Sequence, residues 1–112
     1  MRPYFTEHFK KQLKRLSKKF PHVKEDLINH LNVLDLENEI AIGNSVYKIR
    51  IKSVDLNKGK SGGFRSYLYF FVRKTLIVPL VIYSKSEKEN LSERELQDHI
   101  HETIAELLTR FR

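Results

Sequence analysis

The chain has 112 residues, of which 40% are apolar and 31% charged, so we expect a single domain over residues 1–112 with a core of its own. Twenty-one Lys and Arg against 14 Asp and Glu give a net charge of +7, which favours an anionic partner, either nucleic acid or an acidic protein surface. The lack of cysteine excludes disulfides and thiolate metal sites. No signal-peptide pattern is visible, and apolar runs stop well short of the ~20 residues that cross a bilayer, so we expect a cytoplasmic protein.

The charge is segregated along the chain. Residues 1–24 and 44–74 each carry eight Lys or Arg and one acid, whereas residues 25–43 and 86–109 each have a net charge of −5. A solvated surface usually mixes its signs, so the two basic blocks are candidate contacts for an anion. For residues 1–24 an alternative stays equally open, in which the lysine-rich helix is simply soluble and binds no anion.

A short strand ending at Tyr4 and Phe5 precedes two predicted helices. The first begins after the N-cap Thr6 and runs to about Phe20. Its apolar residues recur every three or four positions: Phe5, Phe9, Leu13, Leu16 and Phe20. Pro21 ends this helix, and a second follows with the same kind of spacing: Val23, Leu27, Leu31 and Leu34. The two predict a helical hairpin.

The apolar period then changes to two, which predicts strands. We expect them at Val46–Ser53, Phe64–Arg73 and Thr75–Ser84, with a loop over residues 54–63 between the first two. Pro79 cannot donate a ladder hydrogen bond, so the third strand should have a bulge there or lie at an edge.

The last segment predicts a helix. Ser92 and Glu95 match a capping box at its start, and apolar residues follow at helical spacing: Leu96, Ile100, Ile104, Leu107 or Leu108, and Phe111. The order (β)ααβββα predicts an α+β fold, with an antiparallel sheet covered by helices on one face.

The sharpest functional signal is in the first long strand. Lys48, Arg50 and Lys52 alternate with apolar residues and so share one strand face. Three like charges repel one another, and at roughly 6–7 Å spacing they suit successive phosphates of a nucleic acid. The alternative is an exposed basic face without a ligand.

The next strand repeats the pattern. If Phe64, Leu68, Phe70 and Val72 face the core, the outer face holds cations among tyrosines: Arg65, Tyr67, Tyr69 and Arg73. That combination fits single-stranded RNA, whose bases stack while its phosphates pair with cations. Ordinary cross-strand packing of the tyrosines is the alternative.

The third strand ends in a phenol, an ammonium and a carboxylate at spacing two: Tyr83, Lys85 and Glu87. Cleavage of RNA without a metal needs a base, an acid and cations for the phosphorane, and these residue types can fill such roles. His99 and His101 diverge on the last helix, so we expect no metal site and no cofactor.

Three stretches together resemble the RelE/ParE toxin superfamily, and its HigB-like branch most closely. They are the basic strand 47–52, the Gly-Lys-x-Gly-Gly-x-Arg loop over residues 59–65, and the segment 82–87 with Tyr-x-Lys-x-Glu. The resemblance covers about residues 40–95. It implies a RelE-like fold and a ribosome-dependent endonuclease that cleaves mRNA through the 2′-hydroxyl, without a metal.

The resemblance also implies roles for single residues. Lys48 and Arg50 match the basic strand pair, Arg65 matches the phosphate-binding arginine, and Lys85 lies in the cluster of the terminal strand. The best-known RelE branch has Arg and Tyr where this chain has Ser86 and about Leu91. The expected catalytic set is therefore Lys48, Arg50, Arg65, Tyr83, Lys85 and Glu87. The expected contacts to RNA or the ribosome are Lys52, Lys58, Lys60, Tyr67, Tyr69, Arg73 and Lys74.

The expected partners are mRNA, the ribosome and a neutralising antitoxin, which would be a small DNA-binding protein. Two other functions stay open at this point. One is a ParE-like inhibitor of gyrase without nuclease chemistry. The other is an RNA-binding protein or a decayed toxin that binds its antitoxin but no longer cleaves.

Overall fold

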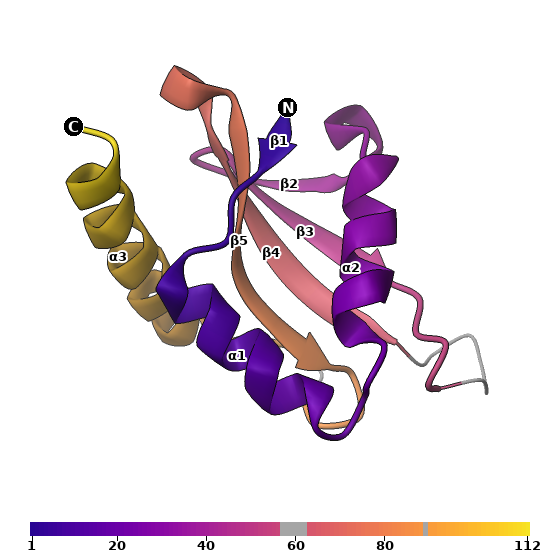
Figure 1. Cartoon of the computed structure of the whole chain (residues 1–112). Helices are drawn as coiled ribbons and strands as arrows, with labels where there is room; N and C mark the ends of the chain where they lie inside the picture. The colour runs from indigo at the N-terminus through magenta and orange to yellow at the C-terminus, as the bar shows by residue number, and fades with distance from the viewer. Residues whose placement is uncertain (57–62, 89) are drawn as a thin grey trace.

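The computed structural model describes residues 1–56, 63–88 and 90–112. Its elements follow the predicted order, with one further strand before the three long ones (Figure 1). They are β1 (Arg2–Pro3), α1 (Glu7–Ser17), α2 (Val23–Asn32), η1 (Leu36–Asn38), β2 (Ile40–Gly43), β3 (Val46–Ile51), β4 (Phe64–Phe71), η2 (Val72–Lys74), β5 (Leu76–Ser84) and α3 (Glu93–Arg110). The α+β class and the helical hairpin are therefore confirmed.

The five strands form one sheet in the order β1-β5-β4-β3-β2. Three of the four pairings are antiparallel, but β1 runs parallel to β5. The prediction of a purely antiparallel sheet is thus wrong at this edge. The missed strand β2 is short and exposed at all four positions, so it lacks the apolar alternation that marks a half-buried strand.

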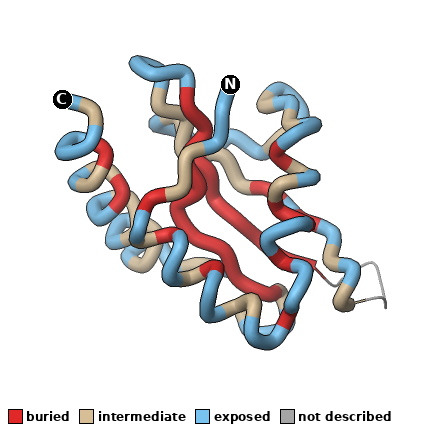
Figure 2. The backbone as a smooth tube through the Cα atoms, viewed as in Figure 1, coloured by how far each residue is buried: buried red, intermediate tan, exposed pale blue. Residues whose placement is uncertain are grey.

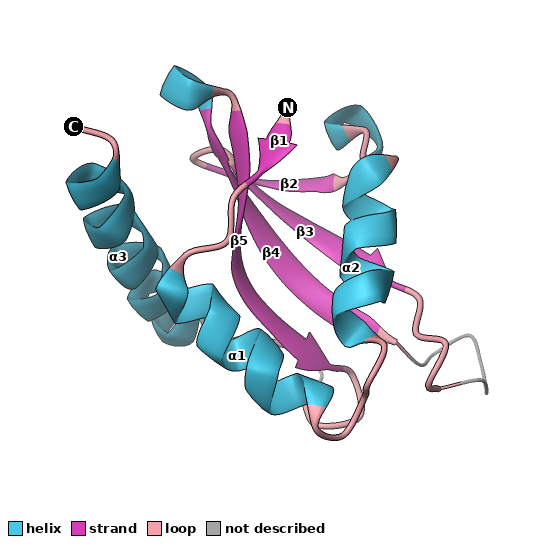
Figure 3. Ribbon diagram, in the orientation of Figure 1, coloured by secondary structure: helices cyan, strands magenta, loops and turns pink. Residues whose placement is uncertain are grey.

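Helices cover both faces of the sheet, not one as predicted (Figures 1 and 3). Phe64 and Leu68 of β4 pack in the cluster formed with α1 and α2. Tyr67, which points to the opposite face, packs instead in a cluster with Leu96 and Ile100 of α3. Because successive side chains of a strand alternate between faces, β4 is buried on both. Figure 2 shows this as a run of buried backbone through the middle of the sheet.

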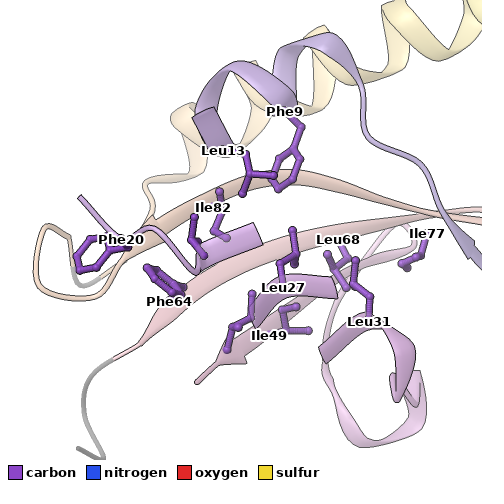
Figure 4. Packing of buried hydrophobic residues seen from close by; sticks show 12 residues of the cluster. Phe9, Leu13, Phe20, Leu27, Leu31, Ile49, Phe64, Leu68, Ile77 and Ile82 are labelled. Carbon is purple, nitrogen blue, oxygen red and sulfur yellow. The ribbon is translucent and has the colours of Figure 1, made fainter. Parts of the chain in front are cut away.

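The main core lies between the helical hairpin and the sheet (Figure 4). Phe9 of α1 and Leu27 of α2 are fully buried and point toward the strands, where Ile49 and Phe64 meet them. Burial of each such side chain contributes roughly 1.5–3 kcal/mol. Thr6 begins α1 as predicted, since its hydroxyl accepts a hydrogen bond from the Phe9 amide at 3.0 Å.

Strand β5 carries the bulge predicted at its proline. Tyr67 pairs with Val81, but the next residue, Leu68, pairs with Pro79, so Leu80 is the extra residue. The short β1 pairs with only part of the edge of β5, and the Gln12 side chain forms hydrogen bonds with the part that β1 leaves unpaired. Its amide nitrogen donates to the Leu80 carbonyl at 3.1 Å, and its oxygen accepts from the Ile82 amide at 3.2 Å. Helix α1 is thereby fixed along this edge.

Gly63 brings the start of β4 close to the end of β3. A Cβ on Gly63 would lie 2.3 Å from the carbonyl oxygen of Ile51, and its φ is +95°. Gly43, the last residue of β2, has a similar φ of +98°, but no atom lies within 4 Å of where its Cβ would be. The need for glycine at position 63 is therefore steric as well as conformational.

We expect Gly63→Ala to destabilise the protein by about 2–4 kcal/mol, because the methyl group forces β3 and β4 apart in addition to the strain of a positive φ. Gly43→Ala is the matched control, with the strain alone and an expected loss of about 1 kcal/mol. Thermal unfolding followed by circular dichroism measures both. Equal losses for the two variants would contradict the steric role of Gly63.

Candidate nucleic-acid interface

The register of the sheet places the predicted cations side by side. Arg50 of β3 lies directly opposite Arg65 of β4, and Arg65 lies opposite Tyr83 of β5. Residues directly opposite one another share a face, so these three form a row across three strands. Lys48 lies two residues from Arg50 and joins them on the same face. We call Lys48, Arg50 and Arg65 the cation row.

The members of the cation row differ in exposure. Arg65 is only 7% exposed, Lys48 is half-buried and Arg50 is exposed. The Arg65 guanidinium donates one hydrogen bond, from Nη1 to the Phe64 carbonyl at 3.3 Å. Within residues 1–56, 63–88 and 90–112, no carboxylate lies within ion-pair distance of the row. A buried guanidinium usually has an anionic partner, so this row is a candidate site for an anion from outside the chain.

Tyr83 lies beside Arg65 but is closed to solvent, with 8% of its surface exposed. Its hydroxyl is buried and has no hydrogen-bond partner among the described residues. Burial, together with the neighbouring phenol of Tyr67, raises the pKa of Tyr83 well above its ordinary value. The raised pKa disfavours the phenolate as a base, and the burial of the ring keeps it from stacking on a base in this structure.

The predicted series of Tyr83, Lys85 and Glu87 on one strand face is wrong at its last member. Strand β5 ends at Ser84, and residues 85–87 form a turn in which the Glu87 amide donates to the Ser84 carbonyl at 3.0 Å. Lys85 still lies at the start of β4, since its amide donates to the Gly63 carbonyl at 3.2 Å. Glu87 is exposed and lines a groove between α1 and α3.

The segment before α3 touches the cation row at a residue that sequence reasoning missed. The Lys48 ammonium donates to the Asn90 side-chain oxygen at 3.2 Å and lies 5.8 Å from the centre of the Tyr67 ring. Lys88 forms an ion pair with Glu95 in the first turn of α3, and this hydrogen bond is the main reason that the pKa of Glu95 falls to about 2. No pattern around Asn90 signals this contact, which depends on how α3 packs.

The predicted tyrosine platform is not open. Tyr67 is 6% exposed, and Tyr69 is half-buried and packs against the same cluster with α3. The stacking of both rings on RNA bases stays a prediction, and it requires that the two rings become more accessible than they are here. Their burial follows from the position of α3 on the face that was predicted to be uncovered.

The other predicted contacts are scattered. Lys52 is exposed just beyond β3, and Lys58 and Lys60 lie outside the described residues. Strand β4 ends at Phe71, so Arg73 and Lys74 lie in η2 at the opposite end of β4 from Arg65. There the Arg73 guanidinium donates to the Phe111 carbonyl. The structure does not bring these two cations to the row.

A groove of about 590 Å³ runs between α1 and α3 beside β5. Its cations come from both sides: Lys11, Arg15, Lys19 and Lys88. His8 and His99 meet across it, with 2.8 Å between Nε2 and Nδ1, and burial followed by the charge of His8 lowers the pKa of His99. In the described parts of the chain, no three His, Cys, Asp or Glu side chains converge as metal ligands.

A sheet between a helical hairpin and a third helix, with a row of cations across β3 and β4, defines a small basic α+β protein with a candidate site for an anion. The described helices include none with the length and apolar character of a membrane span. A family model described as the RelE toxin of the RelE/RelB toxin–antitoxin system matches residues 1–111. The chain belongs to this family of toxins, whose members pair with antitoxins, and the family resemblance read from the sequence is confirmed.

No curated protein sequence matches the chain. Among solved structures, a mutant of the E. coli toxin RelE in the free state is similar, with 17% sequence identity and a TM-score of 0.48, over 99% of this chain and 97% of that one.

We expect Tyr83→Phe to keep or raise stability, by up to about 1 kcal/mol, because it removes a buried hydroxyl that has no partner. Thermal melts of the variant and of wild type measure the difference. A loss of stability of more than about 1 kcal/mol would show instead that the hydroxyl makes a favourable hydrogen bond.

Proposed function

We propose that this protein is an mRNA endonuclease that acts on the ribosome and inhibits translation, as the toxin of a type II toxin–antitoxin pair. The observation that carries the proposal is the pairing of Arg50 with Arg65 across β3 and β4, with Lys48 beside them and no described carboxylate to neutralise them. Two adjacent guanidiniums repel each other unless an anion lies between them. A scissile phosphate meets that requirement, since each arginine can bind two of its oxygens.

The reaction supported by these residues needs no metal. The 2′-oxygen of the ribose attacks the adjacent phosphorus, the bond to the 5′-oxygen of the next nucleotide breaks, and the products are a 2′,3′-cyclic phosphate and a 5′-hydroxyl. The phosphorane gains negative charge in the transition state, where Arg50 and Arg65 stabilise it. Lys48 and Lys85 are the candidates for moving protons, because both lie at the row and are only half-buried.

In the proposed mechanism, RNA reaches Arg65 only if the residues that cover the cation row move. Arg65 is 7% exposed, and Lys48 is engaged by Asn90. RNA that enters would replace Asn90 as the partner of Lys48 and would displace the segment before α3. In the proposed mechanism Glu87 takes no part in the chemistry, because it faces the groove on the side of α1.

The burial of Arg65 also favours a second candidate, a member of the family that binds RNA or its antitoxin but does not cleave. A site whose central arginine is buried and whose lysine is engaged by Asn90 has this property. We propose that the active form belongs to the HigB-like branch and that its partner is a small DNA-binding antitoxin. The presence or absence of cleavage separates the two candidates, whereas gyrase inhibition would appear as a block of DNA supercoiling.

We expect Arg65→Ala to lower mRNA cleavage by ~10²–10³ and to abolish growth arrest, because a phosphorane ligand is lost. The fold should persist, since the guanidinium makes only one internal hydrogen bond among the described residues. Primer extension on message translated by purified ribosomes measures cleavage, and a thermal melt measures folding. Lys24→Ala, which removes an exposed cation from α2 on the other face, is the control and should cleave as wild type.

Two results would contradict the site. A folded Arg65→Ala variant that cleaves at the wild-type rate would remove Arg65 from the mechanism. Loss of soluble protein would show that Arg65 is a core residue, and in that case Arg50→Ala tests the row, because Arg50 is exposed and its removal leaves the core intact. Wild-type protein that never cuts message would support the second candidate.

A further inference from the structure

A second basic surface lies at the end of the sheet opposite the cation row. Figure 1 shows that β1, η2 and the end of α3 meet there, although they are far apart in the sequence. They enclose a hollow of about 300 Å³. Three cations line it, one from each element: Arg2, Lys74 and Arg110. We call this site the distal pocket.

The walls of the distal pocket are apolar and aromatic, and no acidic residue lines it. Tyr4 and Phe111 meet edge to face with 5.2 Å between ring centres, and the Lys74 ammonium lies 6.0 Å from the centre of the Phe111 ring. Glu106, in the hollow next to it, is already engaged, since its carboxylate accepts from the Glu7 amide at 2.7 Å. Within the described residues, no carboxylate forms an ion pair with the three cations.

Helix electrostatics explains only part of this convergence. A cation in the last turn of α3, such as Arg110, stabilises the helix dipole, and Arg73 satisfies a terminal carbonyl by donating to Phe111. Arg2 and Lys74 belong to other elements, and neither helps to end the helix. Arg2, Lys74 and Arg110 are all exposed and line one hollow from three elements, an arrangement that suits an anion from outside the chain.

The backbone next to Lys74 is strained, which is a second, independent observation. Thr75 has φ +53° and ψ +47°, a left-handed conformation that a β-branched residue rarely adopts. The conformation costs roughly 1–2 kcal/mol and is usually left to glycine or asparagine. A left-handed residue commonly closes a short hairpin loop, and here it closes the turn between β4 and β5 that carries Lys74 to the pocket.

We propose that the distal pocket binds the phosphodiester backbone of RNA, as a second contact beyond the cation row. Phosphates suit it because guanidinium groups bind them in bidentate fashion and because a polynucleotide supplies one charge per nucleotide. The apolar walls can cover the ribose or base face next to the bound phosphate. The inference rests on the proposed function for its choice of RNA, and structured ribosomal RNA is the source to which it commits, since the message would occupy the cation row.

The test compares two triple variants that lose the same charge. The distal triple combines Arg2→Ala, Lys74→Ala and Arg110→Ala. The control triple combines Lys14→Ala, Lys18→Ala and Lys24→Ala. Its three cations are exposed and lie in α1, just after α1 and in α2. Binding to 70S ribosomes without message, and to a 20-nucleotide single-stranded RNA, is measured over a series of salt concentrations. Poly-glutamate serves as the acidic-protein probe.

The distal triple should weaken ribosome binding by roughly 10–100-fold at moderate salt. The slope of log K against log salt should become shallower by about 2–3, which is about one for each lost phosphate contact. The control triple should weaken ribosome binding clearly less. The distal triple should weaken binding to the oligonucleotide less than binding to the ribosome. The triple Arg2→Lys, Lys74→Arg and Arg110→Lys should restore binding, because it retains the charges.

Several results would overturn the proposal. Equal losses for the two alanine triples would show an effect of net charge alone, and an unchanged ribosome affinity would show an idle surface. A loss confined to poly-glutamate would assign the pocket to an acidic protein, and a loss confined to the oligonucleotide would assign it to message. Because none of these measurements requires cleavage, a failure of the proposed nuclease activity is separate: wild type would bind ribosomes through the distal pocket and leave message intact.

Discussion

Strand β4 is buried on both faces, and the rest of the molecule is arranged around that constraint. Its even-numbered residues from Phe64 to Leu68 face the helical hairpin, whereas Arg65 and Tyr67 lie on the face that carries the cation row and α3. Because the side-chain period of a strand is two, a slip of one residue would put Arg65 into the apolar core. The packing of Phe64 and Leu68 therefore also sets the position of Arg65 opposite Arg50.

Gly63 and the turn after β5 hold that register at the functional end of the strand. Gly63 lies so close to the Ile51 carbonyl that no side chain fits, and its own carbonyl accepts a hydrogen bond from the Lys85 amide. Strands β3, β4 and β5 are thus joined at one point, directly beside Arg65. The absence of a side chain at Gly63 thus lets two strands approach each other.

The two basic surfaces stand at opposite ends of β4 and β5, and they differ in construction. The cation row lies in the register of neighbouring strands and is partly closed by Asn90 and the start of α3. The distal pocket is made by β1, η2 and the end of α3, and it is bounded by aromatic rings. Helix α3 contributes to both, since its start lies at the row and its last turn at the pocket. A change in how α3 packs would alter both surfaces together.

Much of the fold could be read from the residues alone. Apolar periods of 3.6 and 2, the capping residues Thr6 and Ser92 and the bulge at Pro79 are local signals, and each predicted its element. Lys48, Arg50 and Arg65 could be predicted as candidate site residues, because alternation along a strand decides which residues share a face. Strand β2 escaped notice because its four exposed residues carry no such alternation.

Tertiary structure decided what those residues face. Helix α3 is amphipathic in either position, so no local pattern states on which face of the sheet it lies, yet its position buries Tyr67 and Tyr83 and brings Asn90 to Lys48. Pairing between distant segments set Arg50 against Arg65. The residue types and their faces are local properties, whereas burial and neighbours depend on long-range packing.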